Sequence, residues 1–167
     1  ASFPDQSLAL PFDLVPITTN DHARLERVVD ATYVGTLDCP RIDGLRATAD
    51  VIAGYRAVGE SGDRLWRIVH AENEDVGCLL LADHSSTRQY EVVYVGLKPE
   101  LRGRGWGLEL TRHAQWLARH GGCERIVLAV DATGWLRPDA NCSPGRLYCH
   151  VTGHGRGQDQ MVPGWSY

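Results

Sequence analysis

The stretch LRGRGWG, Leu101–Gly107, is the most informative part of the sequence, because it combines three glycines with two arginines and a tryptophan. The run before it, EVVYVGLKP, is rich in β-branched and aromatic residues and predicts a strand. The run after it, LELTRHAQWLARHGG, has apolar residues at helical spacing and ends in two glycines, so it predicts a helix. The stretch therefore forms a strand-to-helix junction.

Such a junction is suited to an anion. The start of a helix presents free backbone N–H groups and a partial positive charge. Glycines let the main chain approach a ligand without a Cβ in the way, and Arg102 and Arg104 add charge and donors. We expect a phosphate or pyrophosphate site over Arg102–Gly107. The alternative is a tight turn that needs glycine for its backbone conformation alone.

The two common phosphate motifs do not fit this junction. A nucleotide P-loop requires GxxxxGK[ST], and no lysine follows the glycines here. A dinucleotide fingerprint GxGxxG beginning at Gly103 would place its last glycine at Leu108. Both classes of nucleotide site are therefore excluded on spacing.

The rest of the sequence predicts an α/β (α+β) domain with a mixed sheet. Three β-prone runs joined by short polar turns favour an antiparallel meander, preceded by a short strand and two helices. The apolar run 125–132 predicts a fully buried strand, parallel to the third meander strand across the loop helix. The expected elements are a short strand at 14–17, helices at 21–33 and 48–58, meander strands at 64–71, 76–83 and 90–97, a short helix at 144–151 and a last strand at 158–162.

Length and charge limit the class of protein. A chain of 167 residues suits one domain, 1–167, in which residues 1–12 are expected to form a loose lead-in. A net charge of −4 provides no basic field for nucleic acid. No apolar run is long enough for a membrane span, and the first residues lack the pattern of a secretory signal. We expect a cytoplasmic protein that binds neither nucleic acid nor membranes.

The cysteines favour neither a disulfide framework nor a metal. There are five of them, at scattered spacing, which is typical of reduced thiols. Cys142, Cys149, His150 and His154 lie close in sequence but match no standard zinc spacing. No metal site is therefore expected.

The glycine junction also resembles a family motif. Arg102–Gly107 matches R/Q-x-x-G-x-G/A, the pyrophosphate loop of the GNAT acyltransferases (GCN5-related N-acetyltransferases). The preceding VGLKPEL resembles that family's strand end, and NCSPGRLY, Asn141–Tyr148, resembles its N-x-x-A-x-x-L-Y element. The order of elements from about Leu14 is similar as well. Three departures follow the loop: Pro144 replaces alanine, TGWLRPDA at 133–140 is extra, and Gly153 is one place late.

The resemblance implies a fold, a cosubstrate and a set of residues. It implies a GNAT-like sheet and acetyl-CoA as the acetyl donor. It also implies that Tyr148 protonates, or hydrogen-bonds, the departing sulfur; the alternative is a tyrosine that packs the short helix on the sheet. Gly96, a residue type that weakens a strand, favours a bulge there. The residues implied for cofactor binding are the main chain of Val95 and Leu97, the loop residues Arg102, Gly103, Arg104, Gly105, Trp106 and Gly107, and Asn141.

Glu91 is the candidate base. Strand alternation predicts that it shares a face with Val93, Val95 and Leu97, and some family members carry a glutamate base at this position. The alternative is a solvated glutamate near the start of a strand. The histidines are weaker candidates: His70, His84 and His113.

We therefore expect an N-acetyltransferase that moves the acetyl group from acetyl-CoA directly to a primary amine. No cysteine is placed by a motif to act as a nucleophile, so no covalent enzyme intermediate is implied. The acceptor stays open between a small molecule and a protein N-terminus or lysine, and the acyl chain could be longer than acetyl. The alternative is a non-catalytic acyl-CoA sensor or interaction module. The five tryptophans and the terminal VPGWSY leave a homodimer possible.

Overall fold

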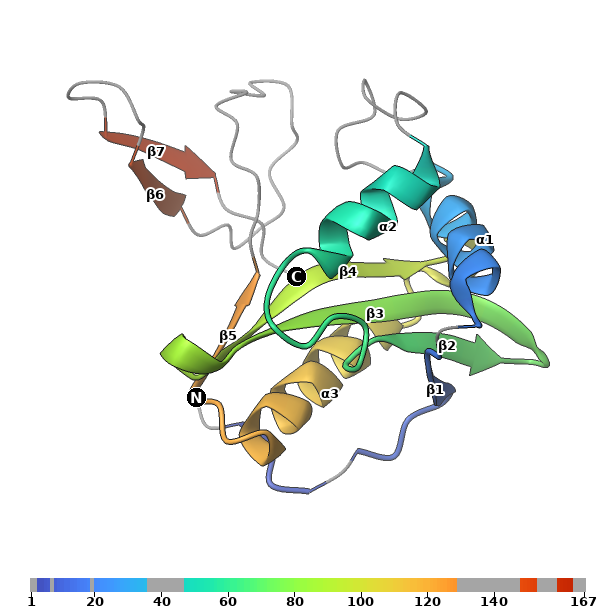
Figure 1. Cartoon of the computed structure of the whole chain (residues 1–167), viewed down its shortest axis with the longest axis horizontal. Coiled ribbons are helices and arrows are strands. Elements are labelled where there is room, and N and C mark those ends of the chain that lie inside the picture. The colour runs from blue at the N-terminus through green and yellow to red at the C-terminus, as the bar shows by residue number, and fades with distance from the viewer. Residues whose placement is uncertain are drawn as a thin grey trace. The chain divides into compact units, whose positions relative to one another are not determined.

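The computed structural model describes residues 3–6, 8–18, 20–35 and 47–128, together with the backbone of two later strands, 148–152 and 159–163 (Figure 1). The chain divides into two compact units, Ala1–Ala129 and Val130–Tyr167. The described helices include none that is long and apolar enough to cross a membrane.

The first unit follows the predicted order of elements. It consists of β1 (Asp13–Pro16), α1 (His22–Tyr33), α2 (Thr48–Arg56), β2 (Arg67–Ala71), β3 (Glu74–His84), β4 (Gln89–Leu97), α3 (Trp106–His120) and β5 (Arg125–Leu128). Short 3₁₀ turns at Ser85–Thr87 and Pro99–Leu101 flank β4. The strands form one sheet in the order β1-β2-β3-β4-β5. The first four run antiparallel to their neighbours and β5 runs parallel to β4, so the predicted mixed sheet is confirmed.

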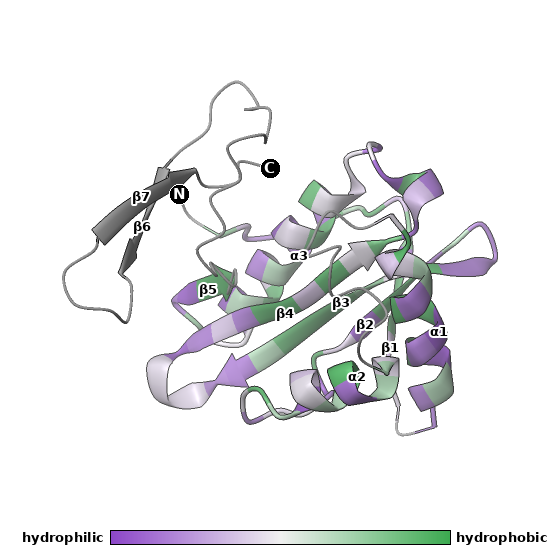
Figure 2. Ribbon diagram, turned by 90° about the horizontal axis from the view of Figure 1, so that it is seen from above, coloured by the Kyte–Doolittle hydropathy of each residue, from purple (hydrophilic) through white to green (hydrophobic). Residues whose placement is uncertain are grey.

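Helices cover both faces of this sheet. Helix α3 packs on one face through Leu110, Ala114 and Ala118, which recur every fourth residue and are fully buried. Helices α1 and α2 pack on the other face, where Leu25, Val29 and Ile52 are fully buried (Figure 1). Strand β3 lies between the two layers, which explains its continuous apolar run from Val76 to Ala82, visible as a green band in Figure 2.

A bulge in β4 changes which side chains share a face. Leu80 pairs with Tyr94 whereas the next residue of β3, Leu81, pairs with Val92, so Val93 is the extra residue. Val93 and Tyr94 therefore both pack on the α1 side, and Leu97 packs on the α3 side. The prediction of one face shared by residues 91, 93, 95 and 97 is wrong, because strict alternation stops at the bulge. The bulge lies at Val93 and not at Gly96.

Other expectations differ from the structure at the periphery. The lead-in is not loose, since Phe12 is buried and Phe3 and Leu10 pack against the α3-side core. Strand β5 is not fully buried: Leu128 is 45% exposed, because β4 is the one neighbour that β5 has among the described residues.

The second unit contains an antiparallel pair of strands, β6 (Tyr148–Thr152) and β7 (Asp159–Pro163). The last strand predicted from the sequence is confirmed. The short helix predicted for 144–151 is wrong over Tyr148–Val151, which lie in β6.

Candidate functional site

The glycine junction has the geometry that its sequence predicts. Helix α3 begins at Trp106, and its N-cap, Gly105, has φ +81°. Gly103 has φ +76°, and this left-handed region is open to glycine at little cost. No side chain caps the helix start. The first N–H groups of α3 are therefore available to a ligand.

Gly107 is an exposed residue of the loop. It lies in the first turn of α3 and its φ is not positive, so its conformation does not require glycine. A Cβ built on it would meet nothing within 4 Å, so packing within the described structure does not require glycine either. A side chain at this position would therefore extend into open space in the described structure.

Arg104 is exposed, as Arg102 is, but its contacts with the rest of the chain are longer. Its side chain is 47% exposed, and its Nη1 lies 3.4 Å from Oε1 of Glu72. Its guanidinium lies over the ring of Trp106, 5.7 Å from the centroid. A long ion pair at the surface contributes little to stability, so this guanidinium can turn to a phosphate at small cost.

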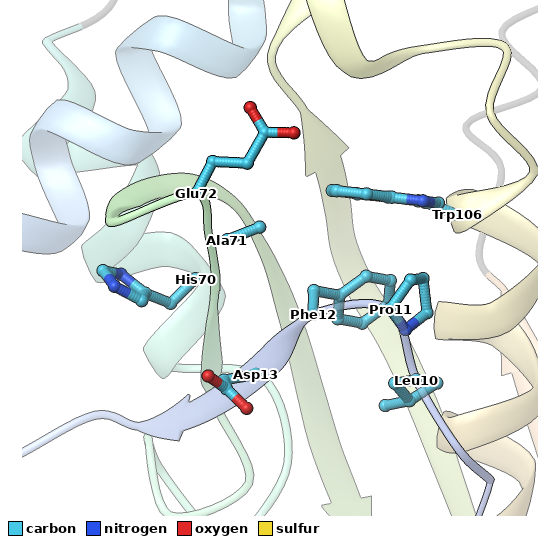
Figure 3. A pocket seen from close by; sticks show the side chains of 8 residues that line it. All are labelled: Leu10, Pro11, Phe12, Asp13, His70, Ala71, Glu72 and Trp106. Carbon is cyan, nitrogen blue, oxygen red and sulfur yellow. The ribbon is translucent and has the colours of Figure 1, made fainter.

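The indole of Trp106 points into a pocket beside the loop. Its ring centroid lies 5.1 Å from that of Phe12. Figure 3 shows both rings at a pocket of about 290 Å³ that the ends of β1 and β2 also line. Two carboxylates, Asp13 and Glu72, line the same pocket, so it does not suit a phosphate. The indole thus packs on the N-terminal segment, and the backbone of Trp106 is the part that belongs to the loop.

Strand β4 offers a free edge next to the loop. Strand β5 pairs with it over Gln89–Val92. From Val93 to Leu97, β4 has no partner on that edge among the described residues. Val95 is 36% exposed there. Backbone groups on this edge are available to the arm of a cofactor, as the resemblance implies for Val95 and Leu97.

Glu91 lies near the point where β4 and β5 part. It pairs with Val127, one residue before the last pair of the ladder. It alternates with Tyr90 and Val92, which belong to the α3-side core, so its side chain lies on the α1 and α2 face. His84 Nε2 lies 2.8 Å from Glu91 Oε2, and the side chains are 28% and 18% exposed.

The His84–Glu91 pair was not predicted. His84 pairs with Gln89 across the β3–β4 hairpin, and Glu91 is the diagonal neighbour two residues along the same face. The hairpin register would have indicated it. The other two histidines have different surroundings. His70 Nδ1 lies 3.0 Å from Asp75, and His113 is partly buried against Trp116, which lowers its pKa through loss of solvation.

Arg102 has contacts other than those its place in the motif suggests. Its guanidinium donates to four backbone carbonyls, three of them at the C-terminal end of α1 and one on Leu97. Its donors are thus directed at the chain's own backbone.

Three tyrosines, one each from α1, α2 and β4, stack on one another where these elements meet. The ring of Tyr94 lies between those of Tyr33 and Tyr55, with centroids 5.4 and 5.6 Å away. The Tyr94 hydroxyl is 2.8 Å from Oγ1 of Thr32. Burial raises the pKa of Tyr94 well above its usual range, so this hydroxyl stays protonated.

The described thiols are unsuited to nucleophilic attack. Burial raises the pKa of Cys78 and that of Cys123, which keeps both in the thiol form. Among the described residues no group of three His, Cys, Asp or Glu side chains could hold a metal. Asn141 lies outside the described residues and Tyr148 is described by its backbone alone, so their implied roles stay predictions.

Comparison with known families agrees with the geometry of the loop and the sheet. The model of the acetyltransferase (GNAT) family matches residues 33–134, more than half of the chain. The chain belongs to the acetyltransferase (GNAT) family. As a member it is an acetyl-CoA-dependent N-acetyltransferase, with acetyl-CoA as the cosubstrate.

Solved structures of this family share the fold. A PaiA N-acetyltransferase from Thermoplasma acidophilum, in complex with coenzyme A, is 17% identical, with a TM-score of 0.56 over 86% of this chain and 94% of its own. A GNAT family acetyltransferase from Brucella melitensis, in complex with acetyl-CoA, is 16% identical, with a TM-score of 0.52 over 93% and 96%. A GCN5-related N-acetyltransferase from Sphaerobacter thermophilus is 16% identical, with a TM-score of 0.57 over 80% and 41%. Curated protein sequences give no match.

A second family model matches the end of the chain. The model described as DDE superfamily endonuclease matches residues 108–167 and overlaps the acetyltransferase match over 108–134. Asn141, Tyr148 and the three departures from the GNAT pattern lie within the endonuclease match and mostly beyond the acetyltransferase match. The GNAT assignment therefore rests on the first unit.

Proposed function

We propose that this GNAT protein transfers the acetyl group of acetyl-CoA directly to a primary amine, with Glu91 as the base. The observation that carries the proposal is the start of α3, where Gly103 and Gly105 have positive φ and no side chain caps the helix. Acetyl-CoA supplies an acetyl thioester, which is activated for attack by an amine. The chain's part is to hold the two substrates, take up a proton and keep water out.

The residues present fit the cosubstrate. The backbone N–H groups at Gly105–Gly107 would hold the pyrophosphate, with Arg104 as a mobile countercharge. The free edge of β4 from Val93 to Leu97 would hold the pantetheine arm through backbone hydrogen bonds. An N–H on this edge would also polarise the acetyl carbonyl, because it is fixed in a partly dehydrated site.

Glu91 would accept the proton that the amine must lose. Its carboxylate is mostly buried on the face that α1 and α2 cover, and His84 holds it from the neighbouring strand. Glu91 and Val95 are four residues apart, about 13 Å along a strand, so the proton would travel through a chain of waters. His84 fixes the direction of the carboxylate and can share the proton.

The first test separates cofactor binding from other nucleotides. Thermal unfolding of the chain is measured with acetyl-CoA, CoA, ATP and NAD. A ligand at about a hundred times its Kd adds about 2.7 kcal/mol of stability. We expect stabilisation by the two CoA species alone, and its loss in Gly105→Glu, because a carboxylate there would repel the pyrophosphate. An absence of stabilisation by CoA in the unmodified chain would contradict the proposal.

The second test addresses catalysis. A panel of primary amines is screened for release of free thiol from acetyl-CoA, and the best acceptor is used with Glu91→Gln. We expect kcat to fall by about 10²-fold or more at unchanged CoA affinity. Glu124→Gln is the control, since Glu124 is 62% exposed and pairs with Arg88. Tight CoA binding without thiol release from any amine would favour the sensor instead.

A further inference from the structure

The C-terminal end of α1 is held by an arginine from the cofactor loop. The last carbonyls of a helix lack partners within the helix, and α1 has no basic residue in its last turn. Arg102 fills this role from far along the chain. Its Nη2 donates to the carbonyls of Thr32, at 2.8 Å, and Val34, at 3.0 Å, and its Nη1 donates to that of Gly35, at 3.1 Å.

The same guanidinium also holds the end of β4. Its Nε donates to the carbonyl of Leu97 at 3.0 Å. A guanidinium has five N–H donors, and contacts to four carbonyls occupy most of them. Arg102 therefore has little capacity left for a phosphate. Arg104, two residues on, has a side chain that is 47% exposed and a long ion pair with Glu72, so it keeps that capacity.

These contacts link the loop proposed to bind CoA with α1, on the side proposed for the acceptor. The carbonyls that Arg102 holds lie next to the place where Thr32 touches β4. There the Thr32 hydroxyl bonds the Tyr94 hydroxyl, and Gly96 leaves room for the Thr32 side chain. Any shift of the loop backbone at residue 102 must therefore move or strain the end of α1.

We propose that Arg102 is a positioning residue that couples the cofactor loop to α1, the wall of the acceptor side. The coupling rests on the proposed function, in that CoA is the ligand that fixes the loop. Binding of CoA at Gly103–Gly107 then stiffens the last turn of α1 through Arg102. By linkage, ordering of α1 by an acceptor favours CoA binding by the same factor.

Amide hydrogen exchange of the full chain, with and without CoA, tests this coupling without any acceptor. In the unmodified chain we expect CoA to slow exchange both at the start of α3 and in the last turn of α1, Asp30–Tyr33. In Arg102→Lys we expect slowing at α3 alone, because an ammonium cannot span four carbonyls. Arg88→Lys is the matched control, because Arg88 is 65% exposed and pairs with Glu124, and it should keep both effects.

Steady-state kinetics supplies a second readout with an acceptor from the amine screen. We expect Arg102→Lys to lower kcat/KM for the amine by about tenfold or more, since misplaced groups lose rate, while Kd for CoA changes less than about threefold. Arg88→Lys, the control outside the proposed site, should leave both kcat/KM for the amine and Kd for CoA unchanged. A purely structural role would lower Tm without this split.

The outcomes for the two proposals are distinct. No slowing at α3 in the unmodified chain would mean that CoA does not bind the loop, and the proposed function fails. If CoA slows exchange at the start of α3 but not in the last turn of α1, the coupling is overturned and the proposed function stands. This comparison uses the unmodified chain, so it decides the question even if Arg102→Lys fails to fold.

Discussion

Gly96 on β4 and Thr32 on α1 approach so closely that a Cβ on Gly96 would lie 2.8 Å from both Cβ and Oγ1 of Thr32. The Tyr94 hydroxyl would be equally close to it. Gly96 thus lets α1 lie directly on β4, the strand whose edge we propose as the binding site of the pantetheine arm. The glycine is required by packing across the sheet and not by its own backbone conformation.

We predict that Gly96→Ala destabilises the chain by about 1–3 kcal/mol, because the added methyl group overpacks the α1–β4 contact. Urea unfolding measures the change. Gly62→Ala is not a suitable control, since Gly62 has φ +58° and is strained by any side chain. Gly54→Ala, on the exposed side of α2, should not destabilise. An unchanged unfolding midpoint for Gly96→Ala would show that α1 moves away from β4 at no cost in stability.

The ion pair between Arg24 and Asp75 should make stability depend on acid pH. Arg24 donates to both carboxylate oxygens at 2.7 Å, and His70 Nδ1 lies 3.0 Å from Oδ1. These partners, Arg24 first, lower the pKa of Asp75 from 3.8 to about 2. The folded pKa is depressed, so the contribution is complete above pH 3.8 and is lost as pH falls toward 2.

We predict that Asp75→Asn costs about 1.5–3 kcal/mol at pH 6, the usual range for hydrogen bonds to a charged group. Chemical unfolding of both proteins between pH 6 and 2 measures the difference. The difference should shrink as pH falls below 3.8 toward 2, and this trend serves as the internal control. A constant difference across the range would mean that the effect comes from packing.

The parts of the fold predicted from the sequence are those fixed by local patterns. Helix α3 and its start follow from the spacing of Leu110, Ala114 and Ala118 and from the positive φ that Gly103 and Gly105 allow. The meander follows from β-prone runs and short turns. The buried run after α3 indicated a strand but not its exposure, because exposure of Leu128 depends on which strands flank β5.

The parts that were missed depend on partners distant in sequence. Strand β4 is apolar on both faces, so its pattern gives no sign that Val93 is the bulged residue. The motif identifies Arg102 as part of the loop, yet its carbonyl partners on α1 lie outside any local window. The partner of Glu91 could have been predicted from the sequence, because the hairpin register brings His84 beside it.

A variant at Tyr148 tests which of the two matched families describes the end of the chain. The acetyltransferase model ends at residue 134, and the endonuclease model covers Tyr148. From the acid role that the GNAT resemblance implies, we expect Tyr148→Phe to lower kcat by about 10²-fold at unchanged CoA affinity. Thiol release and CoA binding are measured side by side with Glu91→Gln. A kcat within about twofold of the unmodified chain would contradict that role.

Gly107 gives the most direct test of the loop, because stability and binding should change in opposite directions. Glutamate favours a helix over glycine and is stabilised in the first turn of a helix, and a Cβ at this position meets no protein atom within 4 Å. We predict that Gly107→Glu is at least as stable as the unmodified chain and binds CoA about tenfold more weakly or worse, since its carboxylate repels the pyrophosphate. Gly54→Glu places the same side chain in α2, where it should leave CoA affinity unchanged. Isothermal titration and thermal unfolding of the three proteins decide the matter. Equal CoA affinity for all three would show that the space at Gly107 is not where the phosphate binds.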